Sequence, residues 1–389
     1  MIPPGHNIGI LGGGQLGTFF CAAAKRQGYF VTVWDPDPEA PAHAWADARI
    51  IEPFDDPAAR RLFMGCCEAA TYEWENIPVE IVAEIEAKIL VRPDSRVLSL
   101  LQNRISEKDF LSEHGFPVTP YLHVREIAQL HAAVKTLGLP VVCKTVVSGY
   151  DGQGQWRIAR LEEIAPLAPQ LRASSSGWIV EKWVPFSREL SVVAVRSETG
   201  AVAVYPLVEN RHEEGILREC RVPAKMDSGI ADKASMLAEA VLAALENVGV
   251  FCIEFFLLED GALMINEIAP RPHNSGHYSL DVCSVSQFEQ QLRVLCGLPL
   301  KNPQLFSPAV MINILGEEIR VLSSEKDLAT LLEIEGCRLY HYRKNTIKAR
   351  RKMGHITLTN AKPEALETQA DLVRSLLERA ARPAGVEPF

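Results

Sequence analysis

Residues 251–277, FCIEFFLLEDGALMINEIAPRPHNSGH, contain two apolar runs separated by the dipeptide Asp260-Gly261. Asp-Gly is typical of the two-residue type I′ turn, so we expect a β-hairpin here. Counting back along both strands from a two-residue loop places Glu254 opposite Glu267, with Cβ atoms roughly 5 Å apart. A longer loop would shift the register and turn one of the two carboxylates to the other face.

Two carboxylates at that separation repel each other and are costly to bury. A hard divalent cation that takes oxygen ligands would convert this cost into binding. The spacing therefore predicts a metal site at Glu254 and Glu267, for Mg²⁺ or alternatively Mn²⁺. The competing interpretation is a solvated sheet face, where paired glutamates are tolerated.

The whole chain has the composition of an ordinary globular protein. Its 389 residues are enough for two or three domains, and it is 47% apolar and 23% charged. We expect no membrane span and no secretory signal, because no apolar run reaches about 20 residues and the start lacks a basic segment before an apolar one. The net charge of −9 argues against a nucleic-acid-binding protein. The nine cysteines include no CxxC pair, which predicts reduced thiols in a cytoplasmic protein.

The N-terminal segment predicts a strand, a glycine turn, a helix and a second strand over residues 7–34. Gly12, Gly14 and Gly17 formally match the GxGxxG pattern of dinucleotide-binding folds, with Asp35 in the place of the ribose-binding acid. A helix that begins after a glycine turn attracts phosphate or carboxylate groups. Three interpretations stay open: a nicotinamide cofactor, another anion, or βαβ packing alone.

The motif TYEWEN at residues 71–76 follows an apolar stretch, at the place where a parallel strand would reach the carboxyl edge of its sheet. Ligands gather at that edge in open α/β sheets. Glu73 and Glu75 could therefore face a polar ligand, or they could cap the helix expected near Pro78.

A second glycine-rich segment, SGYDGQGQ at residues 148–155, follows an apolar strand candidate that carries Lys144. Its glycines leave the backbone free to close over a phosphate chain, to which Lys144 could add a point charge. The segment is not a Walker A loop, because Gly-Lys-Ser/Thr is absent. We expect either a lid that excludes water from a nucleotide or a mobile hairpin tip.

Further polar residues lie in or near apolar strand candidates. Glu181 lies inside the run 178–184. Glu189 could bind two ribose hydroxyls or form a salt bridge with Arg188, and His212 follows in YPLVENRH. The run 342–355 is the most basic stretch of this acidic chain, and by itself it indicates either an anion site or a solvated face.

Seven motifs occur together and in order: ILGGGQLG, YEWENIP, SGYDGQGQ, EKWVPFSRELS, YPLVENRH, INEIAPRPHNSGH and RKMGH. The set closely resembles the N5-carboxyaminoimidazole ribonucleotide synthetase family, ATP-grasp enzymes of purine biosynthesis, from about residue 7 to about residue 357. The motifs NEIAPRPHNSGH and RKMGH are highly specific to that family, whereas the glycine turn is not.

The resemblance implies an α/β and α+β architecture. We expect a Rossmann-like preATP-grasp domain at 1–115, an ATP-grasp domain at 116–300 with a lid at about 116–177, and a small C-terminal domain at 301–389. It also implies a carbon–nitrogen ligase that uses ATP and Mg²⁺. Such an enzyme phosphorylates bicarbonate and transfers the carboxyl group of carboxyphosphate to 5-aminoimidazole ribonucleotide. The expected partners are these small molecules and a second copy of the chain in a homodimer, with no nucleic acid or membrane.

The resemblance also implies roles for individual residues. The metal would be held by Glu254 and Glu267. The nucleotide would be held by Arg104, Lys144, Gly149, Tyr150, Asp151, Gly152, Gln153, Gly154, Gln155, Glu181, Lys182, Trp183, Val184, Glu189, His212, Asn266 and Glu267. The ribonucleotide and bicarbonate would be bordered by Gly14, Gln15, Leu16, Glu73, Tyr150, Asp151, Arg271, His273, Asn274, Ser275, Lys344, Arg351 and Lys352. The catalytic residues would be Asp151, Arg271 and His273, with either His273 or Asp151 accepting the proton of the amine.

Some positions depart from the family pattern. Ser148 stands where glycine is frequent, Gln153 where a cation is frequent, and Lys348-Ala349-Arg350 where Arg-Pro-Gly is more usual, so the cation that meets the phosphate is left open. Strict alternation along the strand points Asn266 away from Glu267. Three rival functions are an ATP-grasp ligase for another acid such as formate, an NAD-dependent dehydrogenase built on the first glycine turn, and a non-catalytic nucleotide-binding scaffold.

Overall fold

The structure is a computed structural model and describes residues 1–147 and 154–382. Its first sheet is parallel with the order β3-β2-β1-β4-β5. The strands are β1 (Asn7–Leu11), β2 (Phe30–Trp34), β3 (Ala48–Ile50), β4 (Ala69–Tyr72) and β5 (Leu90–Val91). The predicted strand, turn, helix and strand over residues 7–34 are confirmed, because α1 (Gln15–Arg26) joins β1 to β2.

Helices cover both faces of this sheet, which is why its strands are continuous apolar runs. One apolar cluster packs α1 and α10 (Gln287–Leu295) against β1 and β2. The other packs α2 (Pro57–Cys66) and α3 (Val79–Glu86) against the opposite face. Two further helices, α4 (Ser95–Gln102) and α5 (Arg104–Glu113), lead out of the sheet toward the rest of the chain.

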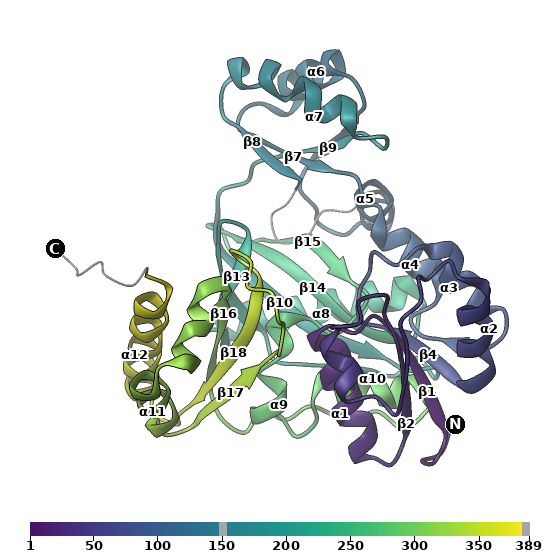
Figure 1. Ribbon diagram of the computed structural model, residues 1–389. Helices are drawn as coiled ribbons and strands as arrows, with labels where there is room; N and C mark the ends of the chain where they lie inside the picture. Colours follow the sequence, from purple (N-terminus) through teal and green to yellow (C-terminus); the bar gives the residue numbers. More distant parts are fainter. Residues whose placement is uncertain (148–153, 383–389) are drawn as a thin grey trace.

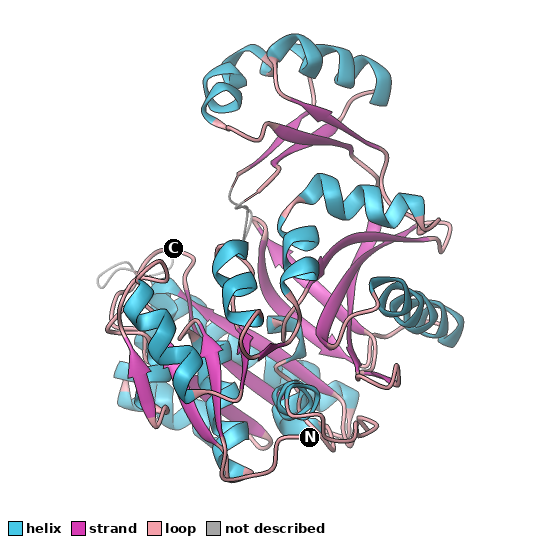
Figure 2. Cartoon of the chain, turned by 90° about the vertical axis from the view of Figure 1, so that its right-hand side faces the viewer, coloured by secondary structure: helices cyan, strands magenta, loops and turns pink. Residues whose placement is uncertain are grey.

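The second sheet is antiparallel with the order β6-β9-β7-β8 and projects from the rest of the molecule (Figure 1). Its strands are β6 (Tyr121–Val124), β7 (Val141–Thr145), β8 (Gln155–Ile158) and β9 (Trp178–Lys182). The helices α6 (Ile127–Leu137) and α7 (Ala168–Ala173) cover its outer face (Figure 2). Its core includes the stacked rings of Trp156 and Trp178, whose centroids are 4.5 Å apart.

The third sheet has nine strands, in the order β15-β14-β10-β12-β13-β16-β18-β17 with β11 paired to β10. The strands are β10 (Phe186–Arg196), β11 (Val202–Val204), β12 (Val208–Glu213), β13 (Ile216–Val222), β14 (Gly249–Leu258), β15 (Leu263–Ala269), β16 (Ala309–Leu315), β17 (Cys337–His341) and β18 (Lys352–Thr359). The helix α8 (Ser228–Leu245) packs on β10, α9 (Ser279–Val282) follows the hairpin, and α11 (Glu325–Glu333) and α12 (Pro363–Ala381) cover the C-terminal strands.

The C-terminal strands continue this sheet, since β16 pairs with β13. The unit expected after residue 300 therefore shares a sheet with the unit before it, and the boundaries at residues 115 and 300 stay predictions. Within the described part of the chain, no helix is both long enough and apolar enough to cross a membrane.

The predicted hairpin is present as β14 and β15, but the prediction of a two-residue turn was wrong. The loop has three residues, Glu259, Asp260 and Gly261: Leu258 and Ala262 pair across it, and Gly261 has a φ of 80°. This longer loop shifts the register, so that Phe255 pairs with Ile265.

A β-bulge at Asn266 then shifts the register back, because two residues of β15 oppose one of β14 there. Glu254 consequently pairs with Glu267, as predicted, although the turn that led to the prediction is different. The extra loop residue and the bulge therefore shift the register by one residue in opposite directions, and the two shifts cancel.

Candidate active site

Two cavities meet beside this hairpin. The first, which we call the hairpin cavity, has a volume of about 390 Å³ and lies between the second sheet and the β14–β15 hairpin. The second, which we call the basic cavity, has a volume of about 620 Å³ and lies between the first sheet, the end of β15 and residues 344–352. Four residues line both cavities: Arg104, Glu267, His273 and Lys352.

The hairpin cavity brings together most of the residues predicted to hold a nucleotide. Those that line it are Arg104, Lys144, Gln155, Glu181, Lys182, Trp183, Val184, Glu189, His212, Asn266 and Glu267, together with Glu254. Gly154 does not line it; its carbonyl accepts a hydrogen bond from the Thr145 amide. The predicted Gly149, Tyr150, Asp151, Gly152 and Gln153 lie outside the described residues.

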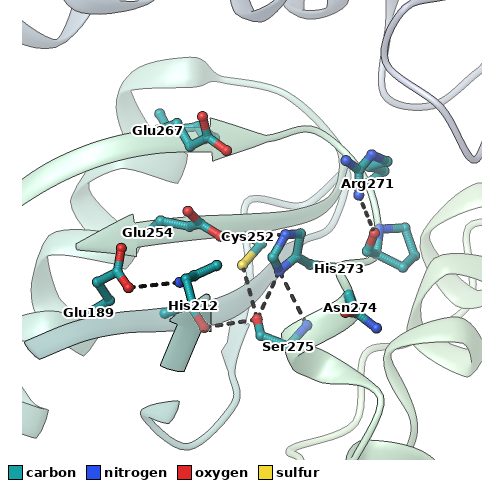
Figure 3. Close-up of polar contacts among 12 residues, drawn as sticks. Glu189, His212, Cys252, Glu254, Glu267, Arg271, His273, Asn274 and Ser275 are labelled. Atoms are coloured by element: carbon teal, nitrogen blue, oxygen red, sulfur yellow. Dashed lines mark hydrogen bonds and ion pairs between the residues drawn. The ribbon is translucent and has the colours of Figure 1, made fainter. Parts of the chain in front are cut away.

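Glu254 and Glu267 face the hairpin cavity from neighbouring strands (Figure 3). Burial and the nearby Glu267 carboxylate raise the pKa of Glu254 to about 7. Burial would also raise the pKa of Glu267, but Arg104, with Nη1 2.8 Å from Oε2, outweighs burial and holds this pKa at about 2. This face is the floor of a cavity, where the Glu254 side chain is 14% exposed and the Glu267 side chain is 36% exposed.

The donor set fits a magnesium or manganese ion. No group of three or more His, Cys, Asp or Glu side chains suited to a metal occurs within residues 1–147 and 154–382. Mg²⁺ does not require one, because it keeps several waters and binds through one or two carboxylates plus substrate phosphates. Two opposed glutamates, one with a raised pKa, would suit such a partial site, and the amide oxygen of Asn266 in the same cavity would offer a third hard donor.

Asn266 lines the same cavity as the two glutamates, so the expectation from strict alternation was wrong. The bulge is the reason, since it interrupts the alternation at this residue. The Oδ1 atom of Asn266 is 3.4 Å from Lys144 Nζ. Lys144 also forms a buried ion pair of 2.9 Å with Glu181, which accepts a further hydrogen bond from Thr119. Lys144 therefore enters the cavity with its position held from two sides.

Glu189 accepts a hydrogen bond of 2.8 Å from His212 Nδ1 at the other end of the hairpin cavity. The alternative salt bridge with Arg188 was wrong, because Arg188 pairs with Glu209. Burial lowers the pKa of His212, but the contact with Glu189 and the charge of Glu254 outweigh it, and the net shift is upward. The carboxylate of Glu189 remains at the cavity wall.

His273 lies between the two cavities and is oriented by a chain of hydrogen bonds (Figure 3). Ser191 donates to Ser275, and the Ser275 hydroxyl lies 2.8 Å from His273 Nδ1, which also accepts from the Ser275 amide. Nδ1 therefore acts as an acceptor, which places the ring proton on Nε2, 3.4 Å from Glu254. Burial, with the charge of Arg271, lowers the pKa of His273, so the ring is neutral.

The basic cavity brings together most of the residues predicted for the ribonucleotide. Those that line it are Gln15, Leu16, Glu73, Arg271, His273, Asn274, Lys344, Arg351 and Lys352. Lys348 and Arg350 line it as well, which adds two cations that were not predicted. Gly14 and Ser275 do not line it: the Gly14 amide donates to Glu73, and Ser275 is buried behind His273. Tyr150 lies outside the described residues.

The first glycine turn already holds two carboxylates of the protein itself. Glu73 accepts hydrogen bonds from the amides of Gly14 and Gly17, and Asp35 accepts one of 2.6 Å from the amide of Gly13. The amides that would bind a dinucleotide pyrophosphate are therefore occupied. This arrangement contradicts the dehydrogenase interpretation and shows that Glu73 caps α1, not the helix after Pro78.

Glu75 and Arg271 form a bidentate ion pair across the basic cavity, with Arg271 Nη2 2.7 Å from Glu75 Oε1 and Nε bonded to Oε2. Arg271 Nη1 donates to the carbonyl of Pro272, so all three guanidinium nitrogens are fixed. The pair joins the first sheet to the hairpin.

Sequence reasoning left several wall residues without a role. In the basic cavity they include Trp74, Asn76, Gln102 and Glu107, and in the hairpin cavity Thr119, Val142, Phe186 and Phe256. The Glu75–Arg271 contact spans 196 residues of sequence, so no local pattern indicates it. A partial signal existed for Phe186 and Phe256, which are both aromatic residues on paired strands and stack with centroids 4.5 Å apart.

Family models match three consecutive parts of the chain. Residues 6–102 match the ribonucleotide synthetase preATP-grasp domain, residues 109–288 match the ATP-grasp domain, and residues 309–369 match the phosphoribosylaminoimidazole carboxylase C-terminal domain.

Relatives match over almost the full chain. N5-carboxyaminoimidazole ribonucleotide synthase of Bacillus subtilis (strain 168) is 42% identical over 357 residues, covering 92% of each chain. The structure of an ADP complex of N5-carboxyaminoimidazole ribonucleotide synthetase has a TM-score of 0.92 at 38% identity, covering 98% of this chain and 99% of that chain. The enzyme from Aspergillus clavatus, in complex with ADP and 5-aminoimidazole ribonucleotide, has a TM-score of 0.88 at 30% identity and covers 96% and 99%. The chain therefore belongs to the N5-carboxyaminoimidazole ribonucleotide synthase family of ATP-grasp enzymes.

Proposed function

We propose that the protein uses ATP to carboxylate 5-aminoimidazole ribonucleotide, the reaction of its relatives in purine biosynthesis. An oxygen of bicarbonate attacks the γ-phosphorus of ATP and ADP leaves. The exocyclic amine then attacks the carbon of carboxyphosphate, phosphate leaves and the amine loses a proton, which gives the N5-carboxylated ribonucleotide. The observation that carries the proposal is that a cavity with paired carboxylates opens into a cavity with several cations, at Glu267 and His273.

ATP fits the hairpin cavity, whose charges are arranged for a nucleotide. Lys144 would meet the phosphates, Glu189 the ribose, and residues 181–184 would border the base. A magnesium or manganese ion held by Glu254 and Glu267, with Asn266 beside them, would neutralise charge that builds on the phosphates. Arg104 lies next to Glu267 and would add a fixed positive charge at the junction of the two cavities.

The ribonucleotide fits the basic cavity. Its phosphate would meet Lys344, Arg351 and Lys352, and Gln15 lines the opposite wall. Arg271, held by Glu75, would present a fixed guanidinium edge toward bicarbonate.

His273 is placed to orient a substrate or donate a hydrogen bond, because its ring proton is on Nε2. This arrangement disfavours His273 as the group that accepts the proton of the amine. Asp151, the other candidate, is outside the described residues, and we retain it as the candidate base.

The test is an ADP-release assay with the purified protein, ATP and MgCl₂. We expect fast ADP formation only when bicarbonate and 5-aminoimidazole ribonucleotide are both present. ADP formation with formate in place of bicarbonate would support the rival ligase, and ATP binding without ADP formation under any condition would support a scaffold. A homodimer, a cytoplasmic location and the domain boundaries at residues 115 and 300 complete the proposal.

A further inference from the structure

The bulge at Asn266 decides whether the carboxylates of Glu254 and Glu267 lie opposite each other. Near the turn the register pairs Leu257 with Leu263 and Phe255 with Ile265. If that register continued, Glu254 would face Asn266, and Glu267 would turn to the opposite side of the sheet. The residues that hold the bulge therefore control the position of the second carboxylate.

The helix α5 lies along the outer edge of β15, which is the edge strand of its sheet (Figure 1). Asn103 fixes the start of α5 by accepting hydrogen bonds from the amides of Ile105 and Ser106. Arg104, Glu107 and Lys108 then occupy positions i, i+3 and i+4, which share one face of a helix.

These α5 side chains contact successive groups of the bulge. Lys108 Nζ donates to the carbonyl oxygens of Ile265 at 3.0 Å and Asn266 at 2.8 Å. Arg104 bonds the Glu267 carboxylate, and Glu107 accepts a hydrogen bond of 2.5 Å from the Ile268 amide. A bulge leaves backbone groups without their regular ladder partners. At this edge α5 supplies partners for the carbonyls of Ile265 and Asn266 and for the Ile268 amide, whereas the Ile265 amide donates to the carbonyl of Pro117.

The burial of the two charged groups argues that this contact is more than packing. Lys108 is 1% exposed and Glu107 is 2% exposed. A buried ammonium costs several kcal/mol unless it is paired and hydrogen-bonded. A methionine would fill nearly the same volume without that cost, but it could not donate to two carbonyl oxygens at once.

We propose that Glu107 and Lys108 are positioning residues for the divalent metal site, because they hold the bulge that places Glu267 opposite Glu254. The register between β14 and β15 is the same whatever reaction the protein performs. The effect of Glu107 and Lys108 on metal binding rests on the proposed function. Glu107 and Lys108 line the contact between α5 and β15, and they act on the metal ligands through the backbone of residues 265–268.

The test is a titration of the ADP-bound protein with Mn²⁺, followed by the electron paramagnetic resonance signal of the free ion. Lys108→Met removes the ammonium group that donates to the carbonyls of Ile265 and Asn266. Glu107→Leu removes the carboxylate that accepts from the Ile268 amide, at nearly constant side-chain shape. We expect each to weaken Mn²⁺ binding about tenfold or more, as for other partners that orient metal ligands. Glu107→Gln keeps an acceptor oxygen and should retain affinity within about threefold. Lys135→Met, on the exposed side of α6, is the control and should bind like the wild type.

Hydrogen exchange in the segment 263–269 gives a second readout. It should become faster in Lys108→Met and Glu107→Leu and stay unchanged in Glu107→Gln. The KM for the ribonucleotide should change less than the Mn²⁺ affinity in Lys108→Met, because Lys108 does not line the basic cavity. Folded Lys108→Met with wild-type Mn²⁺ affinity would overturn the proposal.

Failure of both Lys108→Met and Glu107→Leu to fold would also overturn it, because the residues would then serve the fold as a whole. A wild-type protein that binds Mn²⁺ without forming ADP would reject the proposed reaction and leave the positioning role standing. A wild-type protein that binds no Mn²⁺ in the presence of ADP would reject the metal site, and with it the positioning role.

Discussion

The ion pair between Glu75 and Arg271 gives the most quantitative prediction, because it joins two sheets and can be removed from one side. Breaking a fully buried pair by deleting one partner costs roughly 3–5 kcal/mol. Here the side chains are 22% and 16% exposed, so water offsets part of the loss. We expect Glu75→Ala to cost about 2–4 kcal/mol. A chain of this size loses at most about 2 °C of melting temperature per kcal/mol, which predicts a drop of no more than about 4–8 °C.

Differential scanning calorimetry measures this drop, read on the first transition because a chain with several sheets can unfold in steps. The matched control is Glu162→Ala, which removes a partner of Arg160 from a pair whose side chains are 67% and 69% exposed. That change should cost less than about 1 kcal/mol. Equal shifts for Glu75→Ala and Glu162→Ala would refute the reasoning.

The same pair predicts a pH dependence. Burial opposes the charge of Glu75, but Arg271 outweighs burial and lowers the pKa of Glu75 below its ordinary value of about 4.3. The stabilisation is therefore present above pH 4.3 and is lost as the pH falls below that value. The difference in melting temperature between the wild type and Glu75→Gln should shrink between about pH 5 and pH 3, and a constant difference would contradict the assignment.

Three further changes test the cavities. Glu267→Gln should abolish ADP formation with either Mg²⁺ or Mn²⁺ while the circular dichroism spectrum stays unchanged, and normal turnover would remove Glu267 from the metal site. Lys344→Met and Arg351→Met should each raise the KM for the ribonucleotide by about tenfold or more, as expected for loss of one charge-assisted hydrogen bond. The KM for ATP should stay nearly unchanged, and equal effects on both substrates would argue against phosphate binding by these two residues. Glu73→Ala leaves the two amides at the start of α1 without their acceptor and should lower stability by about 2–4 kcal/mol in calorimetry, whereas an unchanged melting temperature would show that solvent replaces the carboxylate.

Local patterns predicted the elements of the fold well. The alternation of apolar runs and glycine turns placed β1, α1, β2 and the hairpin, since each depends on contacts between near neighbours in sequence. The pairing of Glu254 with Glu267 was predicted from a turn that is not present, and it holds only because the bulge at Asn266 compensates for the third loop residue. A bulge stabilised by Glu107 and Lys108, about 160 residues away, has no signature in the hairpin itself.

The candidate site was predictable where a motif carries its own chemistry and less so where two distant segments meet. The motif NEIAPRPHNSGH indicated the metal and substrate walls, yet Ser275 supports His273 from behind instead of facing a ligand. The glycine turn suggested an anion site, but the anion is Glu73 of the same chain. Glu73 lies 59 residues from Gly14 in the sequence, and only the folded structure brings the two together.

The transfer of oxygen from bicarbonate to phosphate tests the central claim most directly. The reaction is run with ATP, the ribonucleotide and bicarbonate labelled with ¹⁸O, and the phosphate product is analysed by mass spectrometry or by ³¹P NMR. If bicarbonate attacks the γ-phosphorus in the hairpin cavity and the amine then attacks carbon, each phosphate released must carry one labelled oxygen. Phosphate without label, formed at the same rate as ADP, would mean that water takes the phosphoryl group and that carboxyphosphate is not formed.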